Sequence, residues 1–117
     1  MDQPAGTEIV LVLTTLDERG DAPAFARTLV TECLAACVNV LPAMLSIYRW
    51  KGAVESASEQ QLVIKTSSDR LEALKARLSE LHPYEVPEIL VVAVTDAAPS
   101  YRAWLADAGS PPAVRRS

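Results

Sequence analysis

The feature that most constrains the fold is a pair of extended segments, residues 38–50 and 53–66, separated only by Lys51 and Gly52. Glycine adopts positive φ at no steric cost, so these two residues suit a tight hairpin turn. Each arm has about 13 residues, whereas a typical strand has about five or six. The sequence therefore predicts a β-hairpin that is too long for the sheet of a small domain.

Two apolar runs, Ile9 to Leu13 and Ile89 to Val94, lie outside the hairpin. Continuous runs of this length are typical of central strands that are buried on both faces. Pro87 precedes the second run, where a missing backbone N–H is tolerated. We expect both segments to pair in the same sheet.

Three helices are predicted between and after these strands. The first begins near Asp21, an N-cap residue, and continues along an apolar stripe through Leu29 to Cys33, which places Cys33 in the core. The second follows a capping box formed by Asp69 and Glu72. Leucines at intervals of three and four, from position 71 to position 81, define its apolar face.

The third helix is short and follows Pro99, with Tyr101, Trp104 and Leu105 on one face and an end at Gly109. The full order is strand-helix-strand, strand-helix-strand, helix. This order predicts an α+β fold of the ferredoxin-like, split βαβ class (βαββαβ), because each crossover helix then packs on one face of an antiparallel sheet with the right hand.

Length and charge restrict the domain organisation and the partners. The 117 residues suit one domain, residues 1–117, which we expect to be ordered over about 8–108 with mobile tails. The net charge of −4 opposes nucleic-acid binding. No apolar run approaches the roughly 20 residues of a membrane helix, and the first residues do not resemble a secretion signal, so we expect a cytoplasmic protein without a membrane partner.

The long hairpin predicts self-association. Its overhang carries Leu45, Ile47, Tyr48 and Trp50 into solvent, and an isolated two-stranded ribbon is only marginally stable in water. Another copy of the chain is the simplest cover, which makes these four residues candidates for an oligomer interface. The alternative is that Pro42 breaks the first arm and the tip folds back to leave a monomer.

Several motifs of the chain match those of a known family. In order, they are Leu34-Ala35-Ala36-Cys37-Val38-Asn39, Tyr48-Arg49-Trp50-Lys51-Gly52, Glu59, Lys65-Thr66, His82-Pro83-Tyr84-Glu85-Val86-Pro87-Glu88-Ile89, and Tyr101 with Trp104-Leu105. Through them the chain resembles the CutA family of divalent-cation tolerance proteins. The resemblance implies a ferredoxin-like homotrimer similar to the PII signalling proteins, and an association with copper and other divalent metals. Cys33 departs from the family pattern, so its role stays open.

Cys37 and His82 are the candidate metal ligands, because thiolate and imidazole suit both copper and zinc. Two ligands are fewer than the three or four of a stable zinc site. The alternative interpretation makes Cys37 a small buried residue and His82 a helix C-terminal cap. We expect no obligatory cofactor, and copper(II) or another divalent cation as a weakly bound ligand.

A ligand cleft between subunits is the second predicted site. Its candidate residues are Glu59, Lys65, Tyr84, Glu88 and Trp104. In such a cleft Lys65 would bind an anion, whereas Glu59 or Glu88 would bind a cation or an amine. The four aromatic residues Trp50, Tyr84, Tyr101 and Trp104 could line one pocket, but packing at an oligomer interface is the commoner use of such residues.

The sequence therefore predicts a homotrimeric, cytoplasmic, metal-responsive protein that is not an enzyme. Cys37 with His82 could form a nucleophile and base pair if the two are adjacent, but no phosphate-binding glycine loop or nucleophile elbow accompanies them. The alternative functions are a PII-like trimeric sensor that binds a small anionic metabolite and signals to a partner protein, and a trimer that only displays a partner-binding surface.

Overall fold

The computed structural model describes residues 8–108, and the predicted mobile tails and the helix end at Gly109 lie outside this range. The elements in chain order are β1 (Ile9–Asp17), α1 (Ala22–Thr31), β2 (Cys37–Val40), β3 (Met44–Trp50), β4 (Ala53–Ser67), the 3₁₀ turn η1 (Ser68–Arg70), α2 (Leu71–Leu81), β5 (Leu90–Ala93) and α3 (Pro99–Ala108). The order confirms the predicted α+β, ferredoxin-like class.

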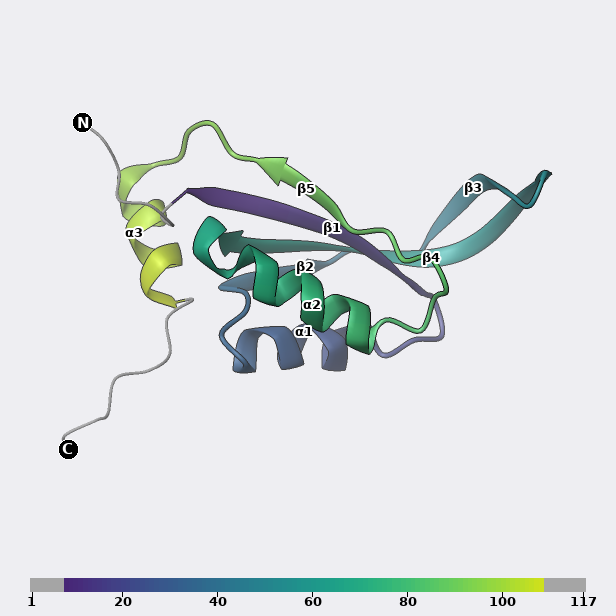
Figure 1. Cartoon of the computed structure of the whole chain (residues 1–117), viewed down its shortest axis with the longest axis horizontal. Coiled ribbons are helices and arrows are strands. Elements are labelled where there is room, and N and C mark those ends of the chain that lie inside the picture. Colours follow the sequence, from purple (N-terminus) through teal and green to yellow (C-terminus); the bar gives the residue numbers. More distant parts are fainter. Residues whose placement is uncertain (1–7, 109–117) are drawn as a thin grey trace.

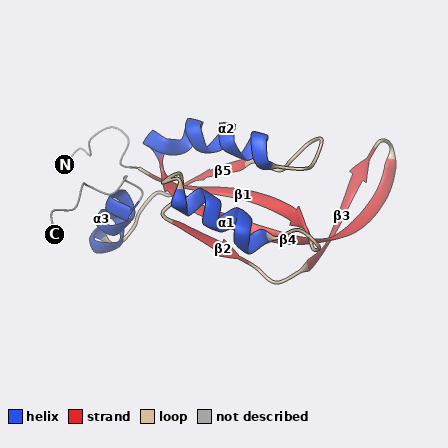
Figure 2. Cartoon of the chain, turned by 90° about the horizontal axis from the view of Figure 1, so that it is seen from below, coloured by secondary structure: helices blue, strands red, loops and turns tan. Residues whose placement is uncertain are grey.

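The strands form one antiparallel sheet in the order β2-β4-β1-β5, and β3 continues beside β4 beyond the end of β2. The helices α1 and α2 lie side by side on one face of this sheet, α3 lies at one end, and the β3–β4 hairpin projects from the other end (Figures 1 and 2). This separation of α3 from the hairpin decides which predicted site residues can meet.

The core lies between the sheet and the helices α1 and α2. Val12 of β1 and Ile64 of β4 are fully buried against Leu29 of α1 and against Leu74 and Leu78 of α2. The leucines at helical spacing predicted the buried face of α2 correctly. Because side chains alternate along a strand, the residues between these buried positions face the other side of the sheet.

That other side, which we call the open face, is apolar and carries no helix within residues 8–108 (Figure 1). By alternation and pairing register it includes Leu11, Leu13, Val63, Leu90 and Val92. Leu90 and Val92 on the edge strand are 54% and 43% exposed. Apolar surface of this extent beside a free strand edge favours a partner on that side.

The end of α1 differs from the prediction. The helix stops at Thr31, and Cys33 adopts a left-handed conformation with φ of 60° instead of extending the buried stripe. The N–H of Leu34 donates to the carbonyl of Leu29 at 3.0 Å, and the N–H of Cys33 donates to the carbonyl of Val30 at 3.0 Å. This is a Schellman cap, with cysteine in the position that glycine usually occupies. Cys33 is therefore a half-exposed capping residue and not a core residue.

The predicted capping box at α2 is also wrong. Asp69 lies in the turn η1, where its carboxylate accepts a hydrogen bond from the hydroxyl of Ser67. The N-cap position of α2 is Arg70, whose side chain makes no capping hydrogen bond. The helix therefore begins as the continuation of a 3₁₀ turn, an arrangement that is common at helix N-termini.

The hairpin forms as predicted at its tip and differs in its first arm. Lys51 and Gly52 have φ of 50° and 82°, the positive values that a type I′ turn requires. β4 is one unbroken strand of 15 residues, whereas Pro42 interrupts the first arm between β2 and β3, as the alternative interpretation held. The tip nevertheless projects away from the body of the subunit and does not fold back (Figure 1).

A bulge at this interruption changes which way the first arm faces. Val40 pairs with Leu62 and Met44 pairs with Glu59, so four steps along the first arm match three steps along β4. One extra residue reverses the alternation of side chains. Even-numbered residues of β2 therefore face the helices, whereas even-numbered residues of β3 lie on the same side as the open face.

Candidate functional site

The segment 82–89, which connects α2 to β5, is fastened to the sheet by His82. The His82 ring is 8% exposed, and its Nε2 lies 2.7 Å from the carbonyl oxygen of Thr15 in β1. The N–H of Tyr84 donates to Nδ1 at 3.2 Å. Since a carbonyl accepts and an N–H donates, Nε2 carries the proton and the ring is neutral. The backbone N–H of His82, and not the ring, caps α2 by donating to Leu78 at 2.9 Å.

Two side-chain hydrogen bonds hold the rest of the segment to β4. The Tyr84 hydroxyl donates to a carboxylate oxygen of Glu59 at 2.8 Å. The Gln61 side-chain amide donates to Glu88 at 3.0 Å and to the carbonyl oxygen of Thr14 at 2.7 Å. Glu59 and Gln61 are two positions apart on β4, so both point to the same side of the sheet. The long motif that starts at His82 thus forms a strap across the end of β1 and the middle of β4.

Tyr84 keeps its phenolic proton in this setting. Burial raises the pKa of the phenol well above its ordinary value of 10.0, and the hydrogen bond to Glu59 and the charge of that carboxylate raise the pKa further. At neutral pH the phenol is therefore a hydrogen-bond donor to Glu59, and Glu59 is an oriented acceptor.

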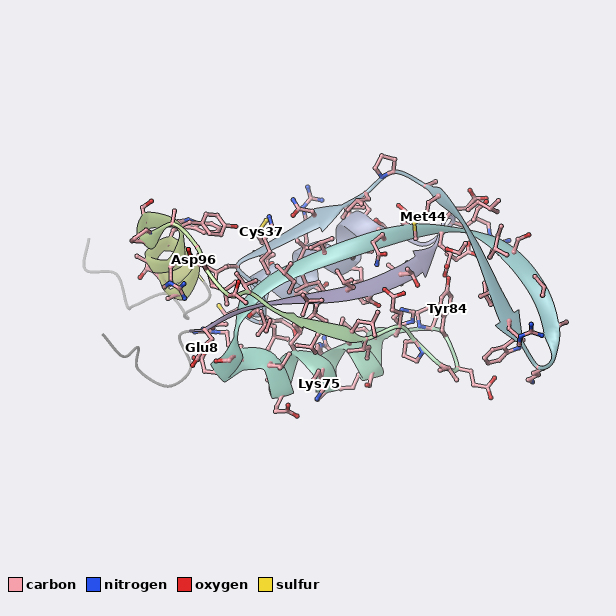
Figure 3. All side chains as sticks on the ribbon, turned by 90° about the horizontal axis from the view of Figure 1, so that it is seen from above. Glu8, Cys37, Met44, Lys75, Tyr84 and Asp96 are labelled. Carbon is pink, nitrogen blue, oxygen red and sulfur yellow. The ribbon has the colours of Figure 1, made fainter. Side chains whose placement is uncertain are left out.

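A cavity of about 490 Å³, which we call the acidic cleft, lies between this strap and the root of the hairpin. Figure 3 shows Tyr84 on the strap beside the hairpin. The lining residues are Thr15, Asp17, Tyr48, Trp50, Glu55, Ala57, Glu59, Tyr84, Glu85, Val86 and Glu88. Five of them are carboxylates and three are aromatic, and within residues 8–108 no lysine, arginine or histidine lines the cleft.

The structure brings three of the five predicted cleft residues together, namely Glu59, Tyr84 and Glu88. Lys65 lies six positions beyond Glu59 on β4, which is about 20 Å along the strand. It faces the open face, where it pairs with Leu11 on one side and Cys37 on the other. Within one chain, Lys65 is outside the cleft.

Trp104 also lies outside the cleft. It belongs to α3, at the end of the molecule opposite the hairpin (Figure 1), and its ring packs against that of Tyr101 with centroids 5.4 Å apart. The four aromatic residues that could have formed one pocket therefore divide into two groups. Trp50 and Tyr84 line the cleft, and Tyr101 and Trp104 form a half-exposed pair on α3.

The four predicted interface residues divide between two faces of the hairpin. Leu45 and Ile47 lie on its outer face, where they are 65% and 69% exposed. Tyr48 and Trp50 line the cleft on the inner face and are 40% and 36% exposed. Alternation along β3 separates the two pairs, and the bulge beside Pro42 sets which pair faces the cleft.

Cys37 and His82 do not meet within the chain. Val38 packs into the core, so the neighbouring Cys37 points to the open face, whereas the His82 ring makes an edge contact with Phe25 of α1 on the helical side. The pairing register also places Cys37 level with Leu11, four positions and about 13 Å from Thr15 along β1. Within residues 8–108, no three histidine, cysteine or carboxylate side chains are close enough to hold a metal ion. One chain alone does not offer a complete metal site.

Sequence reasoning missed three of the acidic residues, Asp17, Glu55 and Glu85. Asp17 pairs directly with Glu59 across β1 and β4, and its pKa is lowered by a hydrogen bond from Arg19. Glu55 is four positions before Glu59 on β4, on the same side of the strand. The available signal was that Glu55 and Glu59 are separated by an even number of positions, which places both on one side of β4. Only the hairpin register shows which side that is.

The comparisons with known proteins agree with this fold. Residues 10–108 match the family described as CutA1 divalent ion tolerance protein. The chain belongs to the CutA family. The divalent-cation tolerance protein CutA of Thermus thermophilus is 42% identical over 95 residues, which cover 81% of this chain and 92% of that protein.

Two further relatives extend the comparison. The protein CutA, chloroplastic, of Arabidopsis thaliana is 38% identical over 82% of this chain and 53% of its own length. The solved structure of the PII-like protein CutA from Nostoc sp. in its apo form superposes with a TM-score of 0.80 at 38% identity, covering 86% of this chain and 97% of that one. The family and the PII-like architecture are therefore shown for this chain. None of its helices within residues 8–108 has the length and apolar character needed to cross a membrane.

Proposed function

We propose that this CutA protein is a cytoplasmic homotrimer, without catalytic activity, that binds copper(II) and other divalent cations weakly at its subunit junctions. The observation that carries the proposal is the position of Cys37 on the open face, where it pairs with Lys65 and lies level with the apolar Leu11. A sister chain that covers this face brings further donors to the same thiol. The family's association with divalent-cation tolerance supports the choice of ligand.

Weak binding follows from the incomplete donor set of one subunit. Thiolate and imidazole suit copper, but a tight site needs three or four converging ligands. A site assembled across a junction has fewer pre-positioned donors and pays more to order them. The separation of Cys37 from His82 also leaves the thiol without the base that a nucleophilic role would need within one chain.

Cys37 and His82 differ as proposed donors. The Cys37 thiol points outward from the sheet, whereas both nitrogens of His82 are already engaged with Thr15 and Tyr84. His82 binds a metal only if its hydrogen bond from the Tyr84 N–H opens. We therefore expect Cys37 to contribute more of the affinity.

Calorimetric titration with copper(II) tests the proposal on the wild type and on Cys37→Ser, with Cys33→Ser as the matched control. We expect Cys37→Ser to weaken binding by about ten-fold or more, the effect of losing one good ligand, and Cys33→Ser to leave binding unchanged. A His82→Ala variant measures the second donor. Unchanged affinity in both Cys37→Ser and His82→Ala rejects these residues as ligands.

The alternative, a sensor of an anionic metabolite, retains one supporting observation, the position of Lys65 on the open face. The acidic cleft disfavours an anion, because five carboxylates line it. A thermal-shift screen with nucleotides and carboxylates separates the two functions, since a ligand that binds only the folded state raises the melting temperature. A rise with such anions that Lys65→Met abolishes would favour the sensor over the metal-binding protein.

A further inference from the structure

We propose that the acidic cleft is a binding site for an organic polyamine, a ligand class separate from the metal ions discussed above. The cleft volume of about 490 Å³ lies within the usual range for small-molecule sites. Its location between the strap and the hairpin root differs from that of Cys37, so polyamine binding does not depend on the proposed metal site.

The negative charge of the lining residues favours a positively charged ligand. Asp17, Glu55, Glu59, Glu85 and Glu88 come from β1, β4 and the strap, and no basic side chain within the described range is among the lining residues. Asp17 is already ion-paired with Arg19 at 3.0 Å, so the four glutamates carry the negative charge that attracts a bound cation.

The aromatic rings indicate an organic ammonium. Tyr48, Trp50 and Tyr84 line the same cavity, and the faces of such rings attract ammonium groups. The protein itself supplies an example, because the ammonium of Lys51 lies 5.5 Å from the centroid of the Trp50 ring. An ammonium from the chain thus already occupies one face of a ring at the edge of the cleft.

The spacing of the carboxylates favours a linear polyamine over a compact metal ion. Glu55 and Glu59 are four positions apart on β4, about 13 Å along the strand. No three histidine, cysteine or carboxylate side chains in residues 8–108 converge closely enough for a metal. A chain of ammonium groups joined by methylene segments pairs with separated carboxylates, and its methylenes pack on the aromatic rings.

Two of the carboxylates are already oriented for this role. Glu59 accepts from Tyr84 and Glu88 accepts from Gln61, so each is held at the edge of the strap with further oxygen lone pairs available. Glu55 and Glu85 lie on opposite sides of the cleft, one on β4 and one on the strap. They are the residues to change, because their replacement leaves the bonds between the strap and the sheet intact.

Calorimetric titration with spermidine, in buffer that contains EDTA to remove transition metals, is the first test. We expect saturable binding to the assembled wild-type protein. The double variant Glu55→Gln and Glu85→Gln should weaken it by about ten-fold or more, the loss expected for charge-assisted hydrogen bonds. The control double variant Glu72→Gln and Glu80→Gln removes two exposed carboxylates of α2 and should change affinity by less than about two-fold, as for screened surface charges.

Tryptophan fluorescence supplies an independent readout of the site. The chain has two tryptophans, so Trp104→Phe leaves Trp50 as the only emitter and Trp50→Phe leaves Trp104. Spermidine should change the emission of Trp50 and leave that of Trp104 unchanged. Absence of saturable binding, equal loss in the two double variants, or a silent Trp50 would each overturn the proposal. None of these results depends on copper, so they do not test the metal-binding proposal, which has its own experiment.

Discussion

Tyr84 is the residue that connects the strap to the root of the hairpin. Its hydroxyl bonds to Glu59, its backbone N–H bonds to the His82 ring, and the two rings lie 4.7 Å apart. The chain therefore uses a single half-buried phenol to hold one wall of the acidic cleft. The sequence predicted His82 as a metal ligand and Tyr84 as a cleft residue. In the structure both hold the strap against the sheet.

The raised pKa of Tyr84 predicts a late step in alkaline titration. A group whose pKa is higher in the folded state gives stability that is fully present below its ordinary value, 10.0 for a phenol, and is lost as pH rises through the raised value. Measured by phenolate absorbance, one of the three tyrosines should titrate well after the others. Tyr84→Phe should remove this late component, whereas the control Tyr101→Phe should retain it.

The carboxylate of Glu59 is the second cause of that shift, so its replacement should be visible in the same titration. Glu59→Gln removes the negative charge and should move the late component part of the way towards the ordinary phenol value. The remaining shift comes from burial, which is the larger cause. An unchanged titration curve in Glu59→Gln would contradict the assigned hydrogen bond.

At the level of single elements, the C-terminal cap of α1 has a conformational free-energy cost. Cys33 occupies the left-handed position of a Schellman cap with φ of 60°. A left-handed conformation costs a residue with a Cβ about 1–2 kcal/mol, and glycine avoids this cost at the expense of about 0.5–1 kcal/mol of backbone entropy.

Cys33→Gly should therefore stabilise the protein by about 0.5–1 kcal/mol, the net gain of relieving this conformation. Urea unfolding at fixed protein concentration measures the change. Cys33→Ala is the matched control, because it removes the thiol and keeps the strained backbone. Equal stability of the glycine and alanine variants would show that the left-handed conformation costs no more than the backbone entropy that glycine adds.

The elements also show why the fold was predictable from the sequence while the site was predictable only in part. Apolar periods of two and of three to four residues specified the strands and helices, and their order specified the ferredoxin-like topology. The one-residue bulge beside Pro42 has no comparable periodic signal, yet it decides that Tyr48 and Trp50 face the cleft while Leu45 and Ile47 face outward. Likewise, the end of α1 was not predicted, because a cysteine occupies the capping position where glycine would have been the usual signal.

Distances between elements were the least predictable quantity. Cys37 and His82 were paired as candidate metal ligands because of their side-chain types. The sequence gives no signal that the two lie on opposite sides of the sheet. Glu59, Tyr84 and Glu88 come together because the strap runs across the end of β1 and the middle of β4, a path that depends on the hydrogen bonds of His82 and Gln61.

For the molecule as a whole, the hairpin and the open face both expose apolar surface to water. The hairpin extends well beyond the sheet (Figure 2), and its outer face carries Leu45, Ile47 and Val54, all more than 60% exposed. The open face adds a second apolar surface that no helix within residues 8–108 covers. Burial of apolar surface stabilises by about 25 cal/mol per Å², so association of identical chains is the expected solution.

The homotrimer proposed above should have three times the chain mass of 12.6 kDa in light scattering at micromolar concentration. The double variant Leu45→Ser and Ile47→Ser removes the apolar side chains from the outer face and leaves the cleft residues of β3 in place. It should lower the mass and make urea unfolding depend more strongly on protein concentration, because stability and assembly are linked. The control Val30→Ser removes an exposed apolar side chain from α1, on the helical side of the sheet, and should keep the wild-type mass. A folded wild type with the mass of one chain would contradict the homotrimer, and with it a metal site completed by sister chains.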